Sequence, residues 1–463
     1  MSNEIRNLEP SIIWNNFCEL NAVPRPSKKE EKVIKFMHDF GVSLGLETQI
    51  DKVGNVVIFK PATDGMENRK TVVLQSHLDM VHEKNNEVDF DFEKSGIQMY
   101  VDNDWVRAKG TTLGADNGLG VATIMSVLES NDIAHPKIEA LFTIDEETGM
   151  TGALKLDENI LDGDILLNLD TEEDDEIGIG CAGGVDITIN NSFDTTIKSN
   201  LLFIKITLNG LSGGHSGMEI HKNLGNSNKL LNSIINDINE SFLIHISEID
   251  GGGLRNAIPR ESSFILGINE LDFESIKSQS LKSFNIIKDQ FLNTDPFIKL
   301  NIVKLKEGFK IIDVDTQTEL INLIGNCPNG VYKMSDNIPG LVETSNNLAN
   351  ISLNDGNLNI NCLTRSSDES SKEELKNIIK FLFINKGYTV DFSGDYPGWQ
   401  PNMSSEILSK LVKVYKDLNS TEPNVAACHA GLECGIIGSH YPKLDMISFG
   451  PTIRGAHSPD ERA

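Results

Sequence analysis

The chain has 463 residues, which is enough for two or three domains with cores of their own. Its formal net charge of -27 argues against binding to nucleic acid or to an anionic membrane. We find no apolar run near the roughly 18 residues that a spanning helix needs, and the first residues do not resemble a secretory signal. We therefore expect a cytoplasmic protein whose six cysteines are reduced thiols.

The first part of the chain alternates helical and strand-like segments. Residues 30–46 carry apolar side chains at helical spacing. Short apolar runs follow at residues 72–78, 140–144 and 165–169, and residues 117–129 are predicted to form a helix. Continuous short apolar runs are typical of buried parallel strands. We therefore expect an α/β domain with a mostly parallel sheet and helices on both faces.

The pattern changes near Asp186. Between residues 187 and 396 the strands are more amphipathic, as at residues 202–208, and Asn, Ser and Asp are frequent. We expect an inserted α+β domain in this region, for which two sheet-plus-helix halves would suit the length. Pro and Gly at residues 396–401 mark the return to the first domain. Residues 1–186 and 397–463 are therefore predicted to form one discontinuous catalytic domain.

Acidic and histidine side chains follow the apolar runs, and another such residue follows the run at 446–450. Ligands of open α/β sheets bind at the carboxyl ends of the strands. Two histidines and several carboxylates at one sheet edge would make a metal site, and their number suggests two metals. The residues at these run ends are His77, Asp79, Glu146, Glu147, Asp170 and His457.

The spacing of these residues suggests separate roles. His77 and Asp79 are two apart, so on extended backbone they share one face and Asp79 can accept a hydrogen bond from the His77 ring. Glu146 and Glu147 are adjacent, so on extended backbone their side chains should point in different directions. One could bind a metal while the other takes a proton from metal-bound water. Each pair alone is more typical of an ordinary polar turn, but together the pairs favour a metal centre.

Asp116 lies between the first two clusters and is flanked by Gly114 and Gly118. Glycine permits backbone angles that other residues rarely adopt. Two metals about 3.5–4 Å apart can share a carboxylate through its two oxygens. We therefore interpret Asp116 as a bridging ligand.

Other residues carry weaker signals. His215 lies in a Gly-rich loop, residues 212–217, which by itself is more typical of a turn than of a site. Asn256 and Arg365 lie in segments whose donors could hold a carboxylate. His429 stays undecided, and the remaining histidines are interpreted as surface or packing residues.

The segments around these residues resemble motifs of the M20 metallopeptidases. More narrowly, they are similar to the bacterial aminoacyl-histidine dipeptidase branch, also called Xaa-His dipeptidase or peptidase D. The similarity spans nearly the whole chain. The segments are residues 75–81, 110–118, 142–149, 168–173, 179–184, 255–261, 429–435 and 450–461.

This resemblance implies two divalent metals, usually zinc, bridged by Asp116. Glu147 and His457 would complete the coordination of one metal, and His77 and Asp170 that of the other. Histidine and carboxylate ligands also suit manganese and cobalt. The peptide bond that follows Asp116 would be cis.

The resemblance also implies the remaining roles. Asp79 would orient its neighbouring histidine, and Glu146 would be the general base. The inserted domain would be a lid and dimerisation domain whose His215 stabilises the oxyanion, often from a partner subunit. Asn256 and Arg365 would bind the C-terminal carboxylate of the substrate.

We therefore predict a homodimeric metal-dependent dipeptidase for Xaa-His substrates, in which a metal-bound hydroxide attacks the peptide and Glu146 takes the water proton. Another amidohydrolase of the family, such as a tripeptidase, deacylase or carboxypeptidase, is an alternative. The chain ends at Ala463, where relatives continue with a helix on the catalytic sheet. A truncated metal-binding protein without catalysis is therefore a further alternative.

Overall fold

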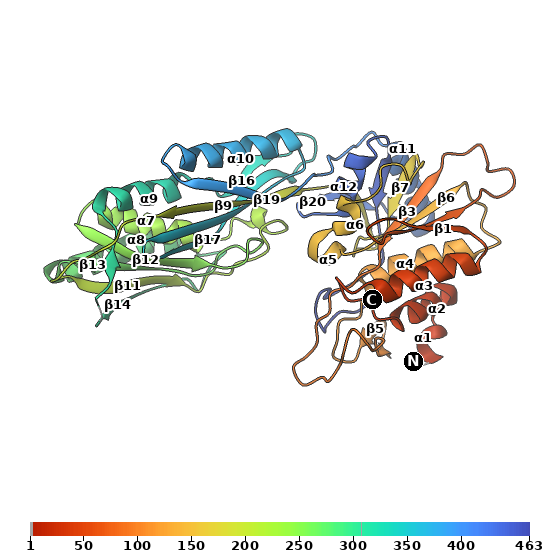
Figure 1. The fold of residues 1–463 in the computed structure, drawn as a ribbon, viewed down its shortest axis with the longest axis horizontal. Coiled ribbons are helices and arrows are strands. Elements are labelled where there is room, and N and C mark those ends of the chain that lie inside the picture. The colour runs from red at the N-terminus through yellow and green to blue at the C-terminus, as the bar shows by residue number, and fades with distance from the viewer. Residues whose placement is uncertain (1–2, 307) are drawn as a thin grey trace. The chain divides into compact units, whose positions relative to one another are not determined.

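The computed structural model describes residues 3–306 and 308–463. By their contacts these residues divide into two compact units, which are described separately below (Figure 1). The first unit comprises the chain up to Cys181, Trp399–Ala427 and Leu432–Ala463. The second unit comprises Ala182–Gly398 and Cys428–Gly431.

The first unit contains an eight-stranded sheet in the order β1-β2-β6-β3-β7-β21-β8-β20. The four central strands, β6, β3, β7 and β21, are parallel to their neighbours in this group. Antiparallel pairing joins β1, β2 and β8 to the group. The strands are β1 (Glu47–Ile50), β2 (Val56–Lys60), β3 (Val72–His77), β6 (Ile138–Thr143), β7 (Ile165–Asn168), β8 (Glu176–Cys181), β20 (Asn424–Cys428) and β21 (Asp445–Ser448).

Helices cover this sheet on both faces, as the sequence predicts. In Figure 1, α3 and α4 lie below the strands and α11 lies above them. The short hairpin β4 (Met99–Asp102) and β5 (Trp105–Ala108) forms a separate two-stranded sheet. The helices are α1 (Asn3–Arg6), α2 (Ser11–Asn21), α3 (Glu31–Ser43), α4 (Ala115–Glu129), α5 (Glu146–Gly149), α6 (Thr151–Leu154), α11 (Glu406–Asn419) and α12 (Glu433–His440).

The central strands are buried on both faces. Leu74 and Phe142 belong to the apolar cluster that α3 and α4 share with the sheet. Val73 and Leu141 alternate with them and therefore point to the opposite face, where they are also buried. Burial on both faces explains the continuous apolar runs in the sequence, and the predicted α/β class is confirmed.

The second unit is built on one antiparallel sheet of nine strands, so its helices share a single sheet rather than two. The path runs β14-β11-β13-β12-β17-β18-β9-β19, and β16 pairs with β17. Its strands are β9 (Gly183–Ser192), β11 (Leu202–Asn209), β12 (Ile244–Gly252), β13 (Ser262–Ile268), β14 (Lys299–Leu305), β16 (Gly330–Met334), β17 (Val342–Asn354), β18 (Asn357–Ser366) and β19 (Thr389–Tyr396), with a separate pair β10 (Thr196–Ile197) and β15 (Lys310–Ile311).

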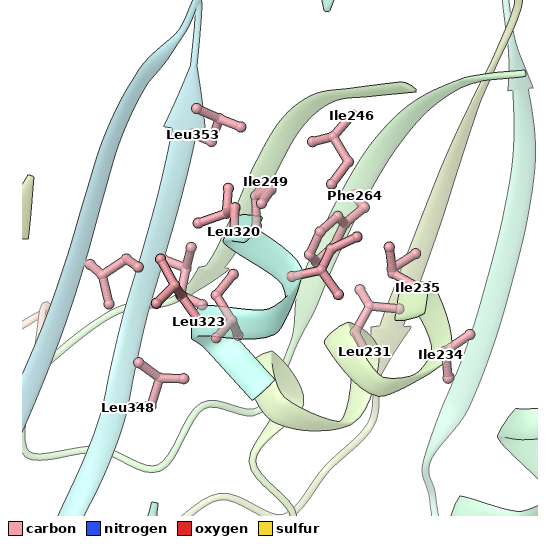
Figure 2. Packing of buried hydrophobic residues seen from close by; sticks show 14 of the residues in the cluster. Leu231, Ile234, Ile235, Ile246, Ile249, Phe264, Leu320, Leu323, Leu348 and Leu353 are labelled. Carbon is pink, nitrogen blue, oxygen red and sulfur yellow. The ribbon is translucent and has the colours of Figure 1, made fainter. Parts of the chain in front are cut away.

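The core of the second unit lies between its sheet and its helices. Its helices are α7 (Ser227–Asn239), α8 (Phe273–Gln290), α9 (Val314–Asn326) and α10 (Glu369–Ile384). In Figure 2, Leu231 and Ile235 of α7 and Leu320 of α9 lie against Ile249 and Phe264 of the sheet. This packing gives the second unit an apolar core of its own.

Two local features bear on the site. Helix α4 begins at Ala115, but Asp116 and Asn117 have non-helical backbone angles. The peptide bond between these two residues is cis, as the resemblance implies.

Among the described residues, no helix combines the length and the apolar character needed to cross a membrane.

Candidate metal centre

Four of the five candidate ligands of the first unit lie at the carboxyl ends of its parallel strands or in the segments that follow, and the fifth, Asp116, lies at the start of a helix. His77 is the last residue of β3, and Asp170 follows the end of β7 by two residues. Glu147 lies in α5, which begins shortly after the end of β6 at Thr143. His457 lies in the segment after β21, and Asp116 lies in the first turn of α4. Parallel strands end at the same sheet edge, so residues distant in sequence come together there.

Asp116 lies between the two histidines. Its Oδ1 is 3.3 Å from His77 Nε2, and its Oδ2 is 3.2 Å from His457 Nε2. Asp170 Oδ1 is 3.5 Å from His77 Nε2, and Glu147 Oε2 is 3.0 Å from His457 Nε2. The structure thus forms two groups of three possible ligands that share Asp116.

Asp79 connects the first histidine with the two glutamates. Its Oδ1 is 3.4 Å from His77 Nδ1 and accepts a hydrogen bond from the amide of Glu146 at 3.0 Å. Its Oδ2 accepts from the Glu147 amide at 3.3 Å and from the Ser27 hydroxyl at 2.8 Å. One buried carboxylate therefore orients a ligand ring and the start of α5 together.

Glu146 and Glu147 point to different histidines, in line with the divergence expected for adjacent residues. Glu147 approaches His457, whereas Glu146 Oε2 lies 4.0 Å from His77 Nε2. The Glu146 carboxylate belongs to neither group that contains Asp116, but it forms a further group of possible ligands with His77 and Glu147. This place would allow the carboxylate either to take a proton from a water molecule or to bind a cation.

The carboxyl groups of the centre carry more negative charge than the two histidines can balance. Burial raises the pKa of Asp170 to about 6 and that of Glu146 well above its ordinary value. Hydrogen bonds with Asp116 and Glu147 raise the pKa of His457 to about 11. Burial opposes ionisation of Asp116, but its histidine partners hold its pKa below the ordinary value. A site with this balance favours bound cations.

Two further observations indicate that the residues present fit two divalent cations. Glu147 Oε1 is buried and has no hydrogen-bond partner among the described residues, and an ion would satisfy such an orphaned oxygen. The donors are imidazole nitrogens and carboxylate oxygens, which suit zinc, manganese or cobalt. The His77 side chain is 1% exposed and that of His457 is 55% exposed, so the centre is open on the His457 side.

A series of buried, hydrogen-bonded polar side chains crosses the sheet close to the strand ends that carry the ligands. Glu433 Oε2 accepts hydrogen bonds from Gln75 Nε2 at 2.7 Å and from Thr143 Oγ1 at 2.5 Å. Gln75 Oε1 accepts from Asn168 Nδ2, and Asn168 Oδ1 accepts from Ser448 Oγ, both at 2.5 Å. These residues follow the strand order β6-β3-β7-β21. We call them the polar ladder, and they link the strand ends that carry the ligands.

His215, in the second unit, has a defined tautomer. Its Nδ1 accepts hydrogen bonds from the amides of Gly217 at 3.2 Å and Met218 at 3.0 Å, so the ring proton lies on Nε2. Burial and the nearby charge of Arg365 lower the pKa of His215. A neutral imidazole with a donor N–H can stabilise an oxyanion.

The other predicted substrate residues also lie in the second unit. Asn256 pairs through its carbonyl with the Ser216 amide at 2.8 Å, next to His215. Arg365 is 6% exposed and donates to Tyr396 Oη at 2.9 Å, while its buried Nε has no hydrogen-bond partner in the described part of the chain. A buried guanidinium with a spare donor suits a carboxylate.

His429, which the sequence leaves undecided, is a buried residue of the same unit. Its Nε2 lies 2.7 Å from Ser345 Oγ. Burial, together with Arg365, lowers its pKa to about 3, so it is neutral. A Cβ on Gly217 would lie 2.2 Å from the His429 carbonyl oxygen and 3.1 Å from His215 Cε1. The glycine therefore lets the two histidine loops approach closely.

A family model described as peptidase family M20/M25/M40 matches residues 73–463. The chain belongs to this family. The cytosol non-specific dipeptidase of Escherichia coli K12 is 41% identical over 460 residues, which cover 99% of this chain and 95% of that protein. The family resemblance drawn from the motifs is thereby confirmed.

Solved structures agree with this assignment. Aminoacylhistidine dipeptidase from Vibrio alginolyticus has a TM-score of 0.93 at 40% identity, covering 99% of this chain and 94% of that chain. Aminopeptidase PepT from Bacillus cereus, at 16% identity, has a TM-score of 0.55 over 98% of this chain and 94% of that one. The PepT likeness concerns the fold alone.

Sequence reasoning missed several groups that support the centre. Glu433 and Gln75 of the polar ladder lie 358 positions apart. Asn117 donates to Leu169 O and to Asp170 Oδ1, both at 2.6 Å, and so orients a candidate ligand. These residues lie inside the segments that resemble motifs of the family, but residue type and spacing do not reveal which residues they contact.

Proposed function

We propose that this family member is a dipeptidase that uses two divalent cations, with zinc preferred, and cleaves Xaa-His dipeptides. The observation that carries the proposal is the pair of ligand groups sharing Asp116. The 41% identity to the E. coli cytosol non-specific dipeptidase over 99% of this chain supports the reaction class. The 40% identity to the aminoacylhistidine dipeptidase supports the histidine preference.

The residues of the first unit would divide the work. His77, Asp116 and Asp170 would hold one cation, and Asp116, Glu147 and His457 the other. When bound, the cations would polarise the peptide carbonyl and make a water molecule more acidic. Glu146 would take the proton of the attacking water and pass it to the leaving amine. Its raised pKa suits a group that must hold a proton between two steps.

The residues of the second unit would act on the substrate. His215 Nε2–H would donate to the developing oxyanion, from the same chain or from a partner. Arg365, through its spare Nε donor, and Asn256 would bind the C-terminal carboxylate of the dipeptide. This would favour substrates with a free carboxylate and only one residue after the scissile bond.

The deciding experiment is hydrolysis of Gly-His, β-Ala-His and Leu-Gly by the purified chain. Each substrate is tested after chelation and after return of zinc or manganese. We expect metal-dependent release of free amino acids, fastest for the substrates that end in histidine. Gly-His amide is the matched control, and it should be cleaved slowly because it lacks the carboxylate.

Other outcomes would point elsewhere. Faster cleavage of Gly-Gly-His would indicate a tripeptidase, and faster cleavage of N-acetylhistidine would indicate a deacylase. A folded sample that binds two metals and cleaves none of these substrates would refute the proposal.

We also propose a homodimer in the cytosol. The family resemblance supports the dimer, and the name of the E. coli relative supports the compartment. Light scattering coupled to size exclusion should give twice the chain mass of 51.0 kDa. A mass of one chain at micromolar concentration would contradict the dimer.

A further inference from the structure

The turn that carries Asp116 is held from both sides by buried charged side chains that are not ligands. We call residues 113–116 the Asp116 turn. We propose that Glu461 and Arg25 are positioning residues, which fix this turn for cation binding before any cation arrives. The inference rests on the proposed metal centre and extends it to residues with no assigned role.

Glu461 binds the amide side of the turn. Its Oε2 accepts hydrogen bonds from the amides of Leu113 at 2.7 Å and Gly114 at 2.9 Å. Its Oε1 accepts from the amides of Ala115 at 2.7 Å and Asp116 at 3.2 Å. The residue is 2% exposed. One carboxylate thus satisfies four successive N–H groups at the start of α4, where no helical acceptor is available.

Arg25 binds the carbonyl side of the same turn. Its Nη2 donates to the Gly114 carbonyl at 2.5 Å. Its Nη1 donates to the carbonyls of Leu78 and Asp79, each at 3.1 Å. These two residues directly follow His77. Arg25 therefore fixes the distance between the Asp116 turn and the strand end that carries the first histidine.

The glycines beside Asp116 leave room for this guanidinium. Gly114 has a φ of +69°, and a Cβ there would lie 2.6 Å from Arg25 Nη2. A Cβ on Gly118 would lie 2.5 Å from the same atom. Gly118 does not have a positive φ, so its role is close approach rather than backbone freedom. A Cβ would also lie 2.8 Å from Met80 Sδ at Gly114 and 2.8 Å from Phe17 Cε2 at Gly118, so close packing around the guanidinium requires both glycines.

Glu461 lies in the same segment as His457. Backbone hydrogen bonds between Arg454 and Arg462, both at 2.9 Å, close this segment into a loop. The loop presents His457 to Asp116 Oδ2 at 3.2 Å. One loop therefore supplies a ligand and also holds the backbone of the bridging ligand.

Repulsion among the ligand carboxylates explains why Glu461 and Arg25 would matter in the metal-free protein. Asp116 lies close to Asp170 and to Glu147, and the negative charges of these carboxylates repel one another when no cation is bound. The hydrogen bonds that Glu461 accepts from the amides and that Arg25 donates to the carbonyl hold the backbone of the turn in place against that repulsion.

The first test uses Glu461→Gln with Asp460→Asn as the matched control, because Asp460 is the exposed neighbour in the same loop. Hydrogen–deuterium exchange of residues 111–118 is measured in chelated protein. Zinc affinity is measured by competition with a chromogenic chelator. We expect exchange to rise about ten-fold and zinc affinity to fall about 10- to 100-fold in Glu461→Gln, while Asp460→Asn resembles the wild type.

Kinetics separate positioning from general stability. Glu461→Gln should lower kcat with little change in KM, and Glu461→Asp, which keeps the charge, should recover part of both zinc affinity and kcat. If Glu461→Gln does not fold, Arg25→Lys and Glu461→Asp carry the same comparisons. Unchanged exchange, or a lower melting temperature with wild-type zinc affinity, would overturn the inference. Absence of zinc binding by the wild type would instead refute the proposed centre. Hydrogen–deuterium exchange of residues 111–118 would still test whether Glu461 and Arg25 hold the Asp116 turn.

Discussion

Asp116 offers one carboxylate oxygen to each histidine of the centre. Its Oδ1 lies 3.3 Å from His77 Nε2 and its Oδ2 lies 3.2 Å from His457 Nε2, so it contacts both histidines at nearly equal distance. Glu146 and Glu147 differ by one position but face different histidines. A single residue step on the first turn of α5 thus separates a candidate ligand from a candidate base.

Replacing Glu146 with glutamine tests this separation. The amide cannot take a proton from water, so kcat should fall roughly 10²- to 10⁴-fold, the usual share of a general base. If the two groups that share Asp116 hold the cations, KM and bound metal should change little, because Glu146 belongs only to the further group with His77 and Glu147. Steady-state kinetics and metal analysis measure both quantities. Loss of metal with loss of activity would show that Glu146 is a ligand.

At the scale of elements, the polar ladder joins β6, β3, β7 and β21. Glu433, at the start of α12, closes the ladder at Thr143 and Gln75. Burial raises the pKa of Glu433 to about 8, so the folded protein keeps a proton on this carboxyl group at neutral pH. The neutral acid avoids a buried charge below the ligands.

This raised pKa predicts a pH dependence of stability. Between about pH 4.5 and pH 8 the unfolded state loses the Glu433 proton and the native state retains it, so the free energy of unfolding falls as pH rises. Glu433→Gln imitates the neutral acid and should remove this decline, worth on the order of a few kcal/mol. Urea unfolding of chelated protein at pH 5, 7 and 9 measures it. Parallel curves for both proteins would contradict the assignment.

At the scale of the whole molecule, every candidate ligand belongs to the first unit, whereas His215 and Arg365 belong to the second. The two units have separate cores, and each should unfold in its own transition. Cations bound only to the native first unit stabilise that unit by mass action.

Metal removal should therefore affect the two transitions differently. Zinc at about 1,000 times its dissociation constant adds roughly 4 kcal/mol, which corresponds to a melting shift of roughly 10 °C for a unit of this size. Calorimetry before and after chelation should show that shift in one transition and none in the other. Zinc, but not calcium, should restore it. Equal shifts of both transitions would indicate ligands in the second unit or coupled unfolding.

The sequence by itself determined the fold class and the family, because apolar runs and the residues at their ends are local patterns. It also predicted the residues that the structure brings together as His77, Asp116, Glu147, Asp170 and His457. His77, Glu147 and Asp170 lie at or soon after strand ends, where the sheet edge makes them neighbours. Asp116 comes instead from the first turn of α4, and His457 from the loop after β21.

Only the tertiary structure decided which polar groups support that edge. Glu433 and Glu461 are acidic residues that local patterns cannot distinguish from solvated ones. The structure buries them, at 0% and 2% exposure, against partners hundreds of positions away. Arg25 likewise carries no local signal, yet it is fully buried against the Asp116 turn. Burial and hydrogen-bond partners depend on long-range packing, which periodicity and spacing do not encode.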